Sequence, residues 1–183
     1  MRVAYADPPY LGKCSMYGHE HGEGGCWDDE MTHAALIQRL CREFPDGWAL
    51  STTSQSLRMM LDHCPDDGIR IGAWVKPFAA FRPNVTPAYA WEPVIFTGGR
   101  RRTREQWSGR DWVSAMPPVF SGERKGLAGM KPEAFCYWLF VDLFGLQPDD
   151  EFVDLFHGSG IVKRSWEAFK RQGVLVEAGE TRE

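Results

Sequence analysis

The sequence lacks the features that would place it outside ordinary globular proteins. No apolar run approaches the roughly 20 residues that span a bilayer. The first residues alternate as a strand does and do not resemble a signal peptide. No internal repeat is visible. Eight tryptophans and eleven phenylalanines argue against disorder, because they can form a sizeable core. We therefore expect residues 1–183 to form one domain without a membrane segment.

Cysteine and net positive charge are also scarce. The five cysteines are odd in number and scattered, which favours reduced thiols over a disulfide framework. The net charge of -4 gives no global attraction to nucleic acid. Any binding to DNA must therefore depend on a local basic patch.

The most informative motif is Asp7-Pro8-Pro9-Tyr10, which directly follows the strand-like run 2–6. The Asp7 carboxylate and the Pro8 carbonyl can both accept hydrogen bonds from an exocyclic amine, while the Tyr10 ring can stack on the heterocycle that carries it. Proline provides the geometry because its ring fixes φ. The motif predicts a clamp for a planar amine. A strand-to-turn exit with a capping aspartate is the alternative.

A second motif lies near the other end of the sequence. Glu151–Phe156 reads as a buried strand and runs into His157-Gly158-Ser159-Gly160 and then a helix over Ile161–Arg171. Glycine allows a ligand to approach the backbone closely, and a helix N-terminus favours a carboxylate or phosphate. Gly173 is expected to end that helix, and Val174–Glu177 to form a strand. An acid at the tip of that strand would suit the hydroxyls of a ribose.

With these motifs the sequence resembles the S-adenosylmethionine-dependent amino methyltransferases that modify adenine N6 or cytosine N4 in DNA. The catalytic motif precedes the cofactor loop, which resembles the permuted β-class subgroup. The aspartate of the clamp favours adenine. The resemblance implies catalytic residues Asp7, Pro8, Pro9 and Tyr10, and cofactor-binding residues Lys131, Asp154, Phe156, His157, Gly158, Ser159, Gly160 and Glu177.

The resemblance also implies a mechanism and a setting. The target base leaves the duplex or is already single-stranded, and its amine attacks the methyl group of S-adenosylmethionine in line. No metal is required. A cytoplasmic protein of a bacterium or a phage-infected cell is expected. Only residues 178–183 follow Glu177, so the adenine pocket of the cofactor is expected to be open, absent, or completed by a second copy or a partner protein.

Helix and strand patterns alternate along the rest of the sequence, which predicts an α/β fold. We expect a doubly wound, mainly parallel sheet of the Rossmann-like methyltransferase type, circularly permuted and without a separate target-recognition domain. The expected helices are Thr32–Phe44, Ser54–His63 and Pro132–Leu143, and the further strands are Trp48–Ser51, Ile69–Val75 and Ala88–Phe96.

The segment Thr97–Gly129 has no clear periodicity and is expected to be a long loop or a small excursion that could contact nucleic acid. Its arginines, with the neighbouring Trp107 and Arg110, suit contacts to phosphates or to a splayed single strand. A solvated basic loop is the alternative. The predicted nucleic-acid-binding residues are Arg100, Arg101, Arg102 and Arg104.

Two further readings remain open. Cys14, His19, His21 and Cys26 could bind zinc, but they lack a short Cys-x-x-Cys pair, and a glycine-rich loop that closes over the target base needs no metal. His157 could contact the cofactor carboxylate or face solvent as a spacer.

The functional alternatives also remain open. A degenerate methyltransferase fold could serve as a nucleic-acid-binding or partner protein without turnover. The same clamp could also take an amine of RNA or of a protein amide.

Overall fold

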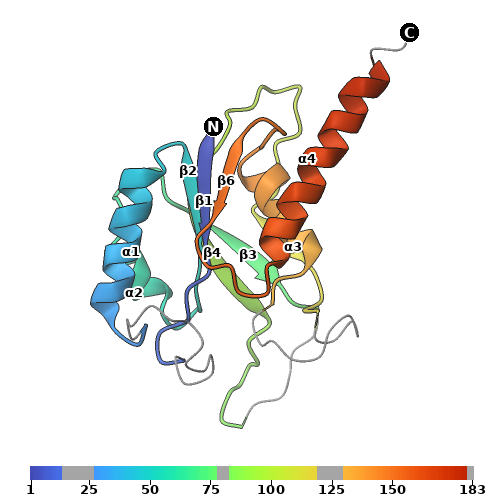
Figure 1. Ribbon diagram of the computed structural model, residues 1–183. Coiled ribbons are helices and arrows are strands. Elements are labelled where there is room, and N and C mark those ends of the chain that lie inside the picture. Colours follow the sequence, from blue (N-terminus) through green and yellow to red (C-terminus); the bar gives the residue numbers. More distant parts are fainter. Residues whose placement is uncertain (14–26, 78–82, 119–129, 181–183) are drawn as a thin grey trace.

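The computed structural model describes residues 1–13, 27–77, 83–118 and 130–180, with side chains of the last helix described as far as residue 172. A six-stranded sheet lies at its centre, with the strand order β5-β3-β4-β2-β1-β6 (Figure 1). The strands are β1 (Arg2–Ala6), β2 (Gly47–Ser51), β3 (Arg70–Val75), β4 (Trp91–Gly98), β5 (Trp112–Ser114) and β6 (Glu151–Asp154).

The sheet is mainly parallel, as expected. Strand β1 pairs in parallel with β2 and β6, and β5 pairs in parallel with β3. Only β4 runs the other way, antiparallel to both of its neighbours. The carboxyl ends of the other strands therefore lie at one edge of the sheet, where ligands bind in open α/β folds.

Helices cover both faces of the sheet (Figure 1). The helices α1 (Glu30–Glu43) and α2 (Leu57–Asp62) lie on one face, and α3 (Glu133–Tyr137), the π-helical turn η2 (Trp138–Leu143) and α4 (Ile161–Glu180) on the other. Val3 and Tyr5 belong to one buried cluster, and Ala4 and Ala6 to the other. Because successive strand residues point to opposite faces, this explains why β1 is apolar throughout.

The predicted strand Val174–Glu177 is wrong. Helix α4 continues through these residues to Glu180, and Gly173 lies inside it. One interior glycine costs a helix only about 1 kcal/mol relative to alanine, so it does not by itself end the helix. Strand β6 is consequently the outermost strand on this side of the described sheet.

The loop expected over Thr97–Gly129 is partly ordered as sheet. Strand β4 continues to Gly98, and the three-residue strand β5 pairs with β3. Three residues are too few to show a periodicity, so the sequence pattern missed β5. The other predicted elements are present, with ends that differ by a few residues. No helix of the described residues is long and apolar enough to cross a membrane.

Candidate active site

The two motifs from opposite ends of the sequence meet at the carboxyl edge of the sheet. Tyr5 of β1 lies opposite Asp154 of β6, and the Leu155 N–H donates to the Tyr5 carbonyl at 3.0 Å. Both strands run in the same direction, so the residues that follow them leave the sheet side by side. Asp7 and the glycine loop therefore border the same edge.

The clamp residues are held in place by a buried turn. Pro8 and Pro9 are buried, and the Lys13 N–H donates to the Tyr10 carbonyl at 2.8 Å. The Tyr10 hydroxyl lies 3.2 Å from Asp7 Oδ1 and 3.0 Å from Glu92 Oε2. A phenol donates one proton, so these two carboxylates share it. The hydroxyl contacts orient the Tyr10 ring beside Asp7.

Lys131 contacts the clamp residues Asp7 and Tyr10, although the family resemblance implies a cofactor-binding role for it. Its ammonium is 2.9 Å from Asp7 Oδ1, 3.0 Å from the Tyr10 hydroxyl and 3.5 Å from Glu92 Oε2. The Lys131 side chain is only 3% exposed. The nitrogen also lies 5.5 Å from the centroids of the Tyr10 and Trp74 rings. A buried ammonium requires such partners, because desolvation disfavours its charge.

Glu92 completes this cluster, and the sequence reading missed it. It belongs to β4, opposite Trp74 of β3, and its other carboxylate oxygen binds the Lys76 ammonium. The sequence signal was a carboxylate inside an apolar strand pattern, since a buried charge is rarely retained without a partner. We call Asp7, Tyr10, Lys76, Glu92 and Lys131 the clamp cluster.

Burial and neighbouring charges have opposite effects on the pKa values of the two carboxyls in the clamp cluster, Asp7 and Glu92. Burial raises the pKa of Asp7, and the Lys131 ammonium offsets part of that effect, so the pKa stays above its usual value. Burial would also raise the pKa of Glu92, but Lys131 and Lys76 together outweigh it and hold the pKa below its usual value. Lys131 is therefore the group that favours an ionised Asp7.

The glycine loop joins β6 to α4 in a tight turn. Gly158 and Gly160 have φ values of 39° and 70°, a region that side chains with a Cβ rarely adopt. The Gly160 N–H donates to the His157 carbonyl at 2.6 Å, and Arg164 donates to the Ser159 carbonyl at 3.0 Å. His157 is exposed.

Asp154 lies at the base of this loop and is buried. Its Oδ1 accepts from the Phe156 N–H at 3.3 Å, while its Oδ2 has no hydrogen-bond partner among the described residues. Burial raises the pKa of Asp154 to about 6, with a smaller contribution from the charge of Asp7. A buried acceptor without a partner is costly in an isolated protein and suits a bound donor.

Asp154 leads to a prediction on stability. The pKa of this carboxyl is 3.8 in the unfolded chain and about 6 in the folded protein, so the folded state binds more protons in that interval. The free energy of unfolding therefore falls as the pH rises through the interval. The loss amounts to about 3 kcal/mol at one pKa unit per 1.36 kcal/mol. The free energy of unfolding of Asp154→Asn, measured in denaturant, should therefore rise by most of that amount relative to the natural protein between pH 4 and pH 7.

The exposed Asp66 supplies the control for this prediction, because Asp66→Asn should shift the free energy of unfolding little at either pH. A difference between Asp154→Asn and the natural protein that stayed constant with pH would contradict the assigned role of burial.

Phe156 of the glycine loop packs against an aromatic neighbour from another part of the sequence. Its ring lies 5.1 Å from Trp27, edge to face, and Trp27 lies 5.3 Å from the His33 ring. His33 is buried, and burial lowers its pKa, so it stays neutral near pH 7. The loop is thereby supported by the residues that lead into α1.

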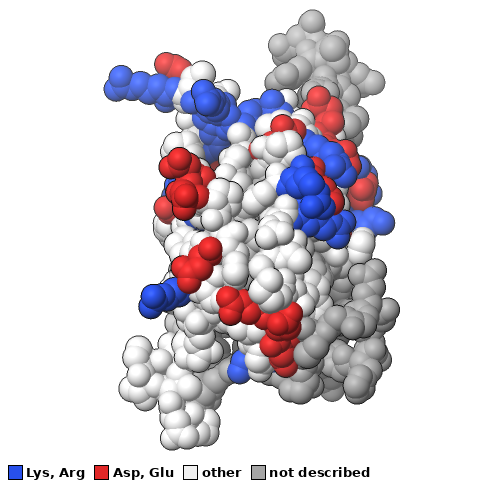
Figure 2. All heavy atoms as spheres, turned by 90° about the vertical axis from the view of Figure 1, so that its left-hand side faces the viewer, with Lys and Arg blue, Asp and Glu red and all other residues white. Residues whose placement is uncertain are grey.

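The predicted basic patch lies at the opposite edge of the sheet. Gly98 at the end of β4 pairs with Gly47 at the start of β2, so Arg100 follows the amino edge. Across the five residues of β1 the two edges are about 17 Å apart, at about 3.3 Å per residue. Figure 2 shows the basic side chains gathered mainly in its upper part, the end at which the N-terminus lies in Figure 1.

Two of the four predicted arginines are bound within the protein. Arg100 donates to Asp150 at 2.8 Å and to the Gly145 carbonyl at 3.1 Å, and Arg102 donates to the carbonyls of Val141 and Asp142. Arg101 and Arg104 are exposed.

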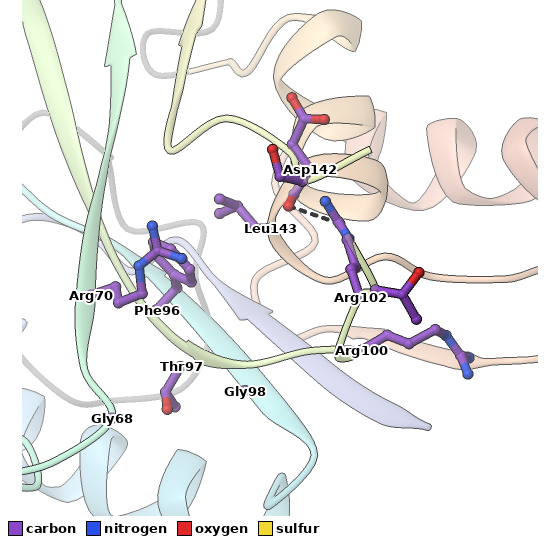
Figure 3. A pocket seen from close by; sticks show the side chains of 11 residues that line it. Gly68, Arg70, Phe96, Thr97, Gly98, Arg100, Arg102, Asp142 and Leu143 are labelled. Carbon is purple, nitrogen blue, oxygen red and sulfur yellow. Dashed lines mark hydrogen bonds between the residues drawn. The ribbon is translucent and has the colours of Figure 1, made fainter. Parts of the chain in front are cut away.

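A hollow of about 290 Å³ lies beside Arg100 and Arg102 (Figure 3). Its lining includes Arg100 and Arg102, whose guanidinium groups are already bonded within the protein. It also lies at the amino edge, away from Asp7, so we do not place the chemistry there.

Some predicted residues fall outside the described part. Cys14, His19, His21 and Cys26 belong to residues 14–26, and the side chain of Glu177 is likewise outside it. Among the described residues no group of three or more histidine, cysteine, aspartate or glutamate side chains is placed to hold a metal ion.

Comparison with known proteins supports the fold. No protein-family model and no curated protein matches the sequence. Among solved structures, the M1.HpyAVI–SAM complex matches with a TM-score of 0.63 and 15% identity over 92% of this chain and 78% of that chain. A structure of M1.HpyAVI matches with a TM-score of 0.57 and 11% identity over 93% and 76%. The expected α/β fold of the Rossmann-like methyltransferase type is confirmed.

Proposed function

We propose that the protein transfers a methyl group from S-adenosylmethionine to the exocyclic amine of a base in DNA, with adenine N6 as the target. The observation that carries this proposal is the meeting of the clamp and the glycine loop at one edge of the sheet, on the adjacent parallel strands β1 and β6. The likeness in fold to M1.HpyAVI, which was solved with SAM, supports the choice of cofactor.

The residues around the glycine loop fit such a cofactor. Gly158 and Gly160 leave the backbone open to close approach, and Asp154 Oδ2 offers an acceptor without a partner in the described chain. We assign the cofactor to Asp154, Phe156 and the loop His157–Gly160. Bound there, S-adenosylmethionine supplies an electrophilic methyl group. Glu177 is left out of the assignment, because its segment is helical and forms no strand tip.

The clamp cluster would orient the target amine. The Asp7 carboxylate and the Pro8 carbonyl accept from its two N–H bonds, and the Tyr10 ring stacks on the base. The base must leave its duplex to reach this site. Lys131 favours the ionised form of Asp7, and Glu92 lies close enough to retain the ammonium when the amine binds at Asp7. Catalysis then rests on proximity and orientation.

Tyr10 should contribute through both its ring and its hydroxyl. Tyr10→Ala removes the stacking surface, and we expect KM for DNA to rise about tenfold or more, because one base–aromatic stack is worth about 1–3 kcal/mol. Tyr10→Phe keeps the ring but loses its contacts to Asp7 and Glu92, so a smaller rise is expected. Steady-state kinetics on DNA distinguish the two variants, and equal effects would contradict a stacking role.

Labelled-methyl transfer to unmodified DNA, followed by mass spectrometry of the nucleosides, tests the proposal directly. N6-methyladenine is the expected product. N4-methylcytosine would overturn the choice of base, and product found only in RNA or protein would overturn the choice of substrate.

A binding protein without turnover is the second candidate, and one observation favours it. The Asp7 carboxylate is already engaged by an ammonium, as it would be in a site that no longer takes a substrate amine. Calorimetry with S-adenosylmethionine separates the two. Cofactor binding together with transfer supports the enzyme, whereas binding of DNA with neither cofactor binding nor transfer supports the second candidate.

A further inference from the structure

Two exposed tryptophans flank an arginine beside the edge strand β5. The Arg110 guanidinium lies 5.5 Å from the centroid of the Trp107 ring and 5.5 Å from that of the Trp112 ring. Trp107 is 56% exposed and Trp112 46%. We call these three residues the Trp–Arg stack. Large aromatic side chains that are clustered and exposed to solvent are unusual away from binding surfaces.

Hydrogen bonds to neighbouring segments hold the Trp–Arg stack in place. The Trp107 indole donates to Asp142 Oδ1 at 2.8 Å, and Arg102 donates to the Trp107 carbonyl at 3.1 Å. The buried Trp138 donates to the Arg110 carbonyl at 2.8 Å. These bonds order the backbone and the Trp107 ring before any ligand arrives, which reduces the entropy lost on binding.

The sequence segment that holds the Trp–Arg stack is basic although the protein is acidic, and Asp142, which accepts from the Trp107 indole, adds one acid beside it. The segment 97–114 holds five arginines against two acids, Glu105 and Asp111, a balance of +3, whereas the whole chain has a net charge of -4. Asp111 lies 3.7 Å from Arg70. Within the described part of the chain, Arg110 forms no ion pair. Aromatic faces combined with unneutralised arginine suit a polyanion that carries planar rings.

Strands β3 and β4 connect the Trp–Arg stack with the carboxyl edge of the sheet. Trp112 lies opposite Ala73, and Trp91 of β4 lies opposite Val75, two residues further along β3. Residues two apart point to the same face, so Trp112 and Trp91 share one face of the sheet. Trp91 is 41% exposed. Glu92, the next residue, points to the other face of the sheet, so a strand that passes from Trp91 to the clamp cluster must cross the carboxyl edge.

The distance between these two tryptophan positions is short. At about 4.8 Å between strands and about 3.3 Å per residue, their Cα atoms lie about 12 Å apart, across the two strand spacings from β5 to β4. A nucleic-acid strand therefore needs to span only a few nucleotides to pass from the Trp–Arg stack to Trp91 at the carboxyl edge.

We propose that the Trp–Arg stack binds unpaired nucleotides next to the target base, with Trp107 and Trp112 stacking on bases and Arg110 contacting the backbone. Trp91 continues this track to the carboxyl edge of the sheet, on the face opposite to Glu92. This inference rests on the proposed function, because it supplies the substrate contact that the bonded Arg100 and Arg102 do not provide. It also specifies the substrate as a single strand or an opened duplex.

Fluorescence anisotropy with a labelled single-stranded oligodeoxynucleotide of mixed sequence, and with the duplex of equal length, tests this proposal. The double variant Trp107→Ala/Trp112→Ala should bind the single strand at least tenfold more weakly and the fully paired duplex nearly as before. In methyl transfer its KM for DNA should rise while kcat and the affinity for S-adenosylmethionine stay unchanged. Arg110→Ala should lower the salt dependence of single-strand binding by about one phosphate contact.

Two exposed residues of α1 provide matched controls. Met31→Ala removes a side chain that is 67% exposed, and Arg39→Ala removes one positive charge; neither should change binding of the single strand. Circular dichroism and the melting temperature establish that each variant is folded.

The outcomes separate this proposal from the proposed function. Unchanged single-strand affinity in a folded double variant, or an equal loss for the paired duplex, overturns the Trp–Arg stack as a site for unpaired bases, even if methyl transfer is observed. Conversely, loss of single-strand binding in the double variant supports the Trp–Arg stack even if the natural protein methylates no DNA, and then the proposed function is wrong.

Discussion

Replacing Asp7 with alanine is expected to reduce methyl transfer by about a thousandfold while leaving the affinity for S-adenosylmethionine nearly unchanged. Removal of one group aimed at a reacting centre typically costs a hundredfold to a thousandfold in rate. Asp7 is in addition the carboxylate that would hold the target amine. The proposed cofactor residues lie on the neighbouring strand and its loop, so calorimetry should show binding close to that of the natural protein.

Asp7→Ala should also remain folded, which makes the result interpretable. Lys131 keeps Glu92 Oε2 at 3.5 Å as a partner when Asp7 is absent, so its ammonium is not left without a carboxylate. Asp62→Ala serves as a matched control, because that carboxylate is exposed at the end of α2. Unchanged turnover in folded Asp7→Ala would refute the assignment of the clamp.

Lys131→Met is expected to produce the largest loss of stability, with a distinctive dependence on pH. Breaking a buried ion pair from one side typically costs about 3–5 kcal/mol, because the remaining charge is left uncompensated. Without Lys131, burial of Asp7 is no longer opposed, so the pKa of Asp7 rises further above its usual value. The pKa of Glu92 rises as well, because only Lys76 remains to offset its burial.

The sign of the pH effect follows from these shifts. A carboxyl with a raised folded pKa binds more protons in the folded than in the unfolded state, so stability falls as the pH rises toward that pKa. The loss in free energy of unfolding caused by Lys131→Met should therefore be greatest near pH 7.5. It should be smaller at pH 4.5, where Asp7 and Glu92 take up protons. Denaturant unfolding at both pH values measures this change.

Two variants make the Lys131 experiment specific. Lys131→Arg retains the charge, so its loss in free energy of unfolding should be smaller and nearly independent of pH. Lys163→Met removes an exposed ammonium of α4 and should have little effect. If the deficit of Lys131→Met did not depend on pH, Lys131 would stabilise the protein by packing alone and would not maintain the charge of Asp7.

Local motifs were the most predictable part of this protein. Asp7-Pro8-Pro9-Tyr10 and His157-Gly158-Ser159-Gly160 each have their chemistry within four consecutive residues, so the sequence alone indicates what they can bind. The strands before them were equally evident, because β1 is buried on both faces and reads as a continuous apolar run.

The partners of these motifs were less predictable. Lys131 and Asp7 are 124 positions apart in the sequence, and nothing in the local pattern indicates that they touch. Glu92 was missed because its strand was read for its apolar residues. The predicted strand Val174–Glu177 was wrong, because extending an existing helix is favourable. The strand propensity of four residues is too small to oppose it.

The amino-acid sequence by itself determined the class of fold and the two chemical motifs, because periodicity and turn chemistry act over a few neighbouring residues. Only the tertiary structure decided that Lys131 and Glu92 bind the clamp, that Arg100 and Arg102 are used internally, and that Trp107 and Trp112 flank Arg110 in solvent. These outcomes depend on which strands pair and in what register, and such pairings join residues that are far apart along the chain.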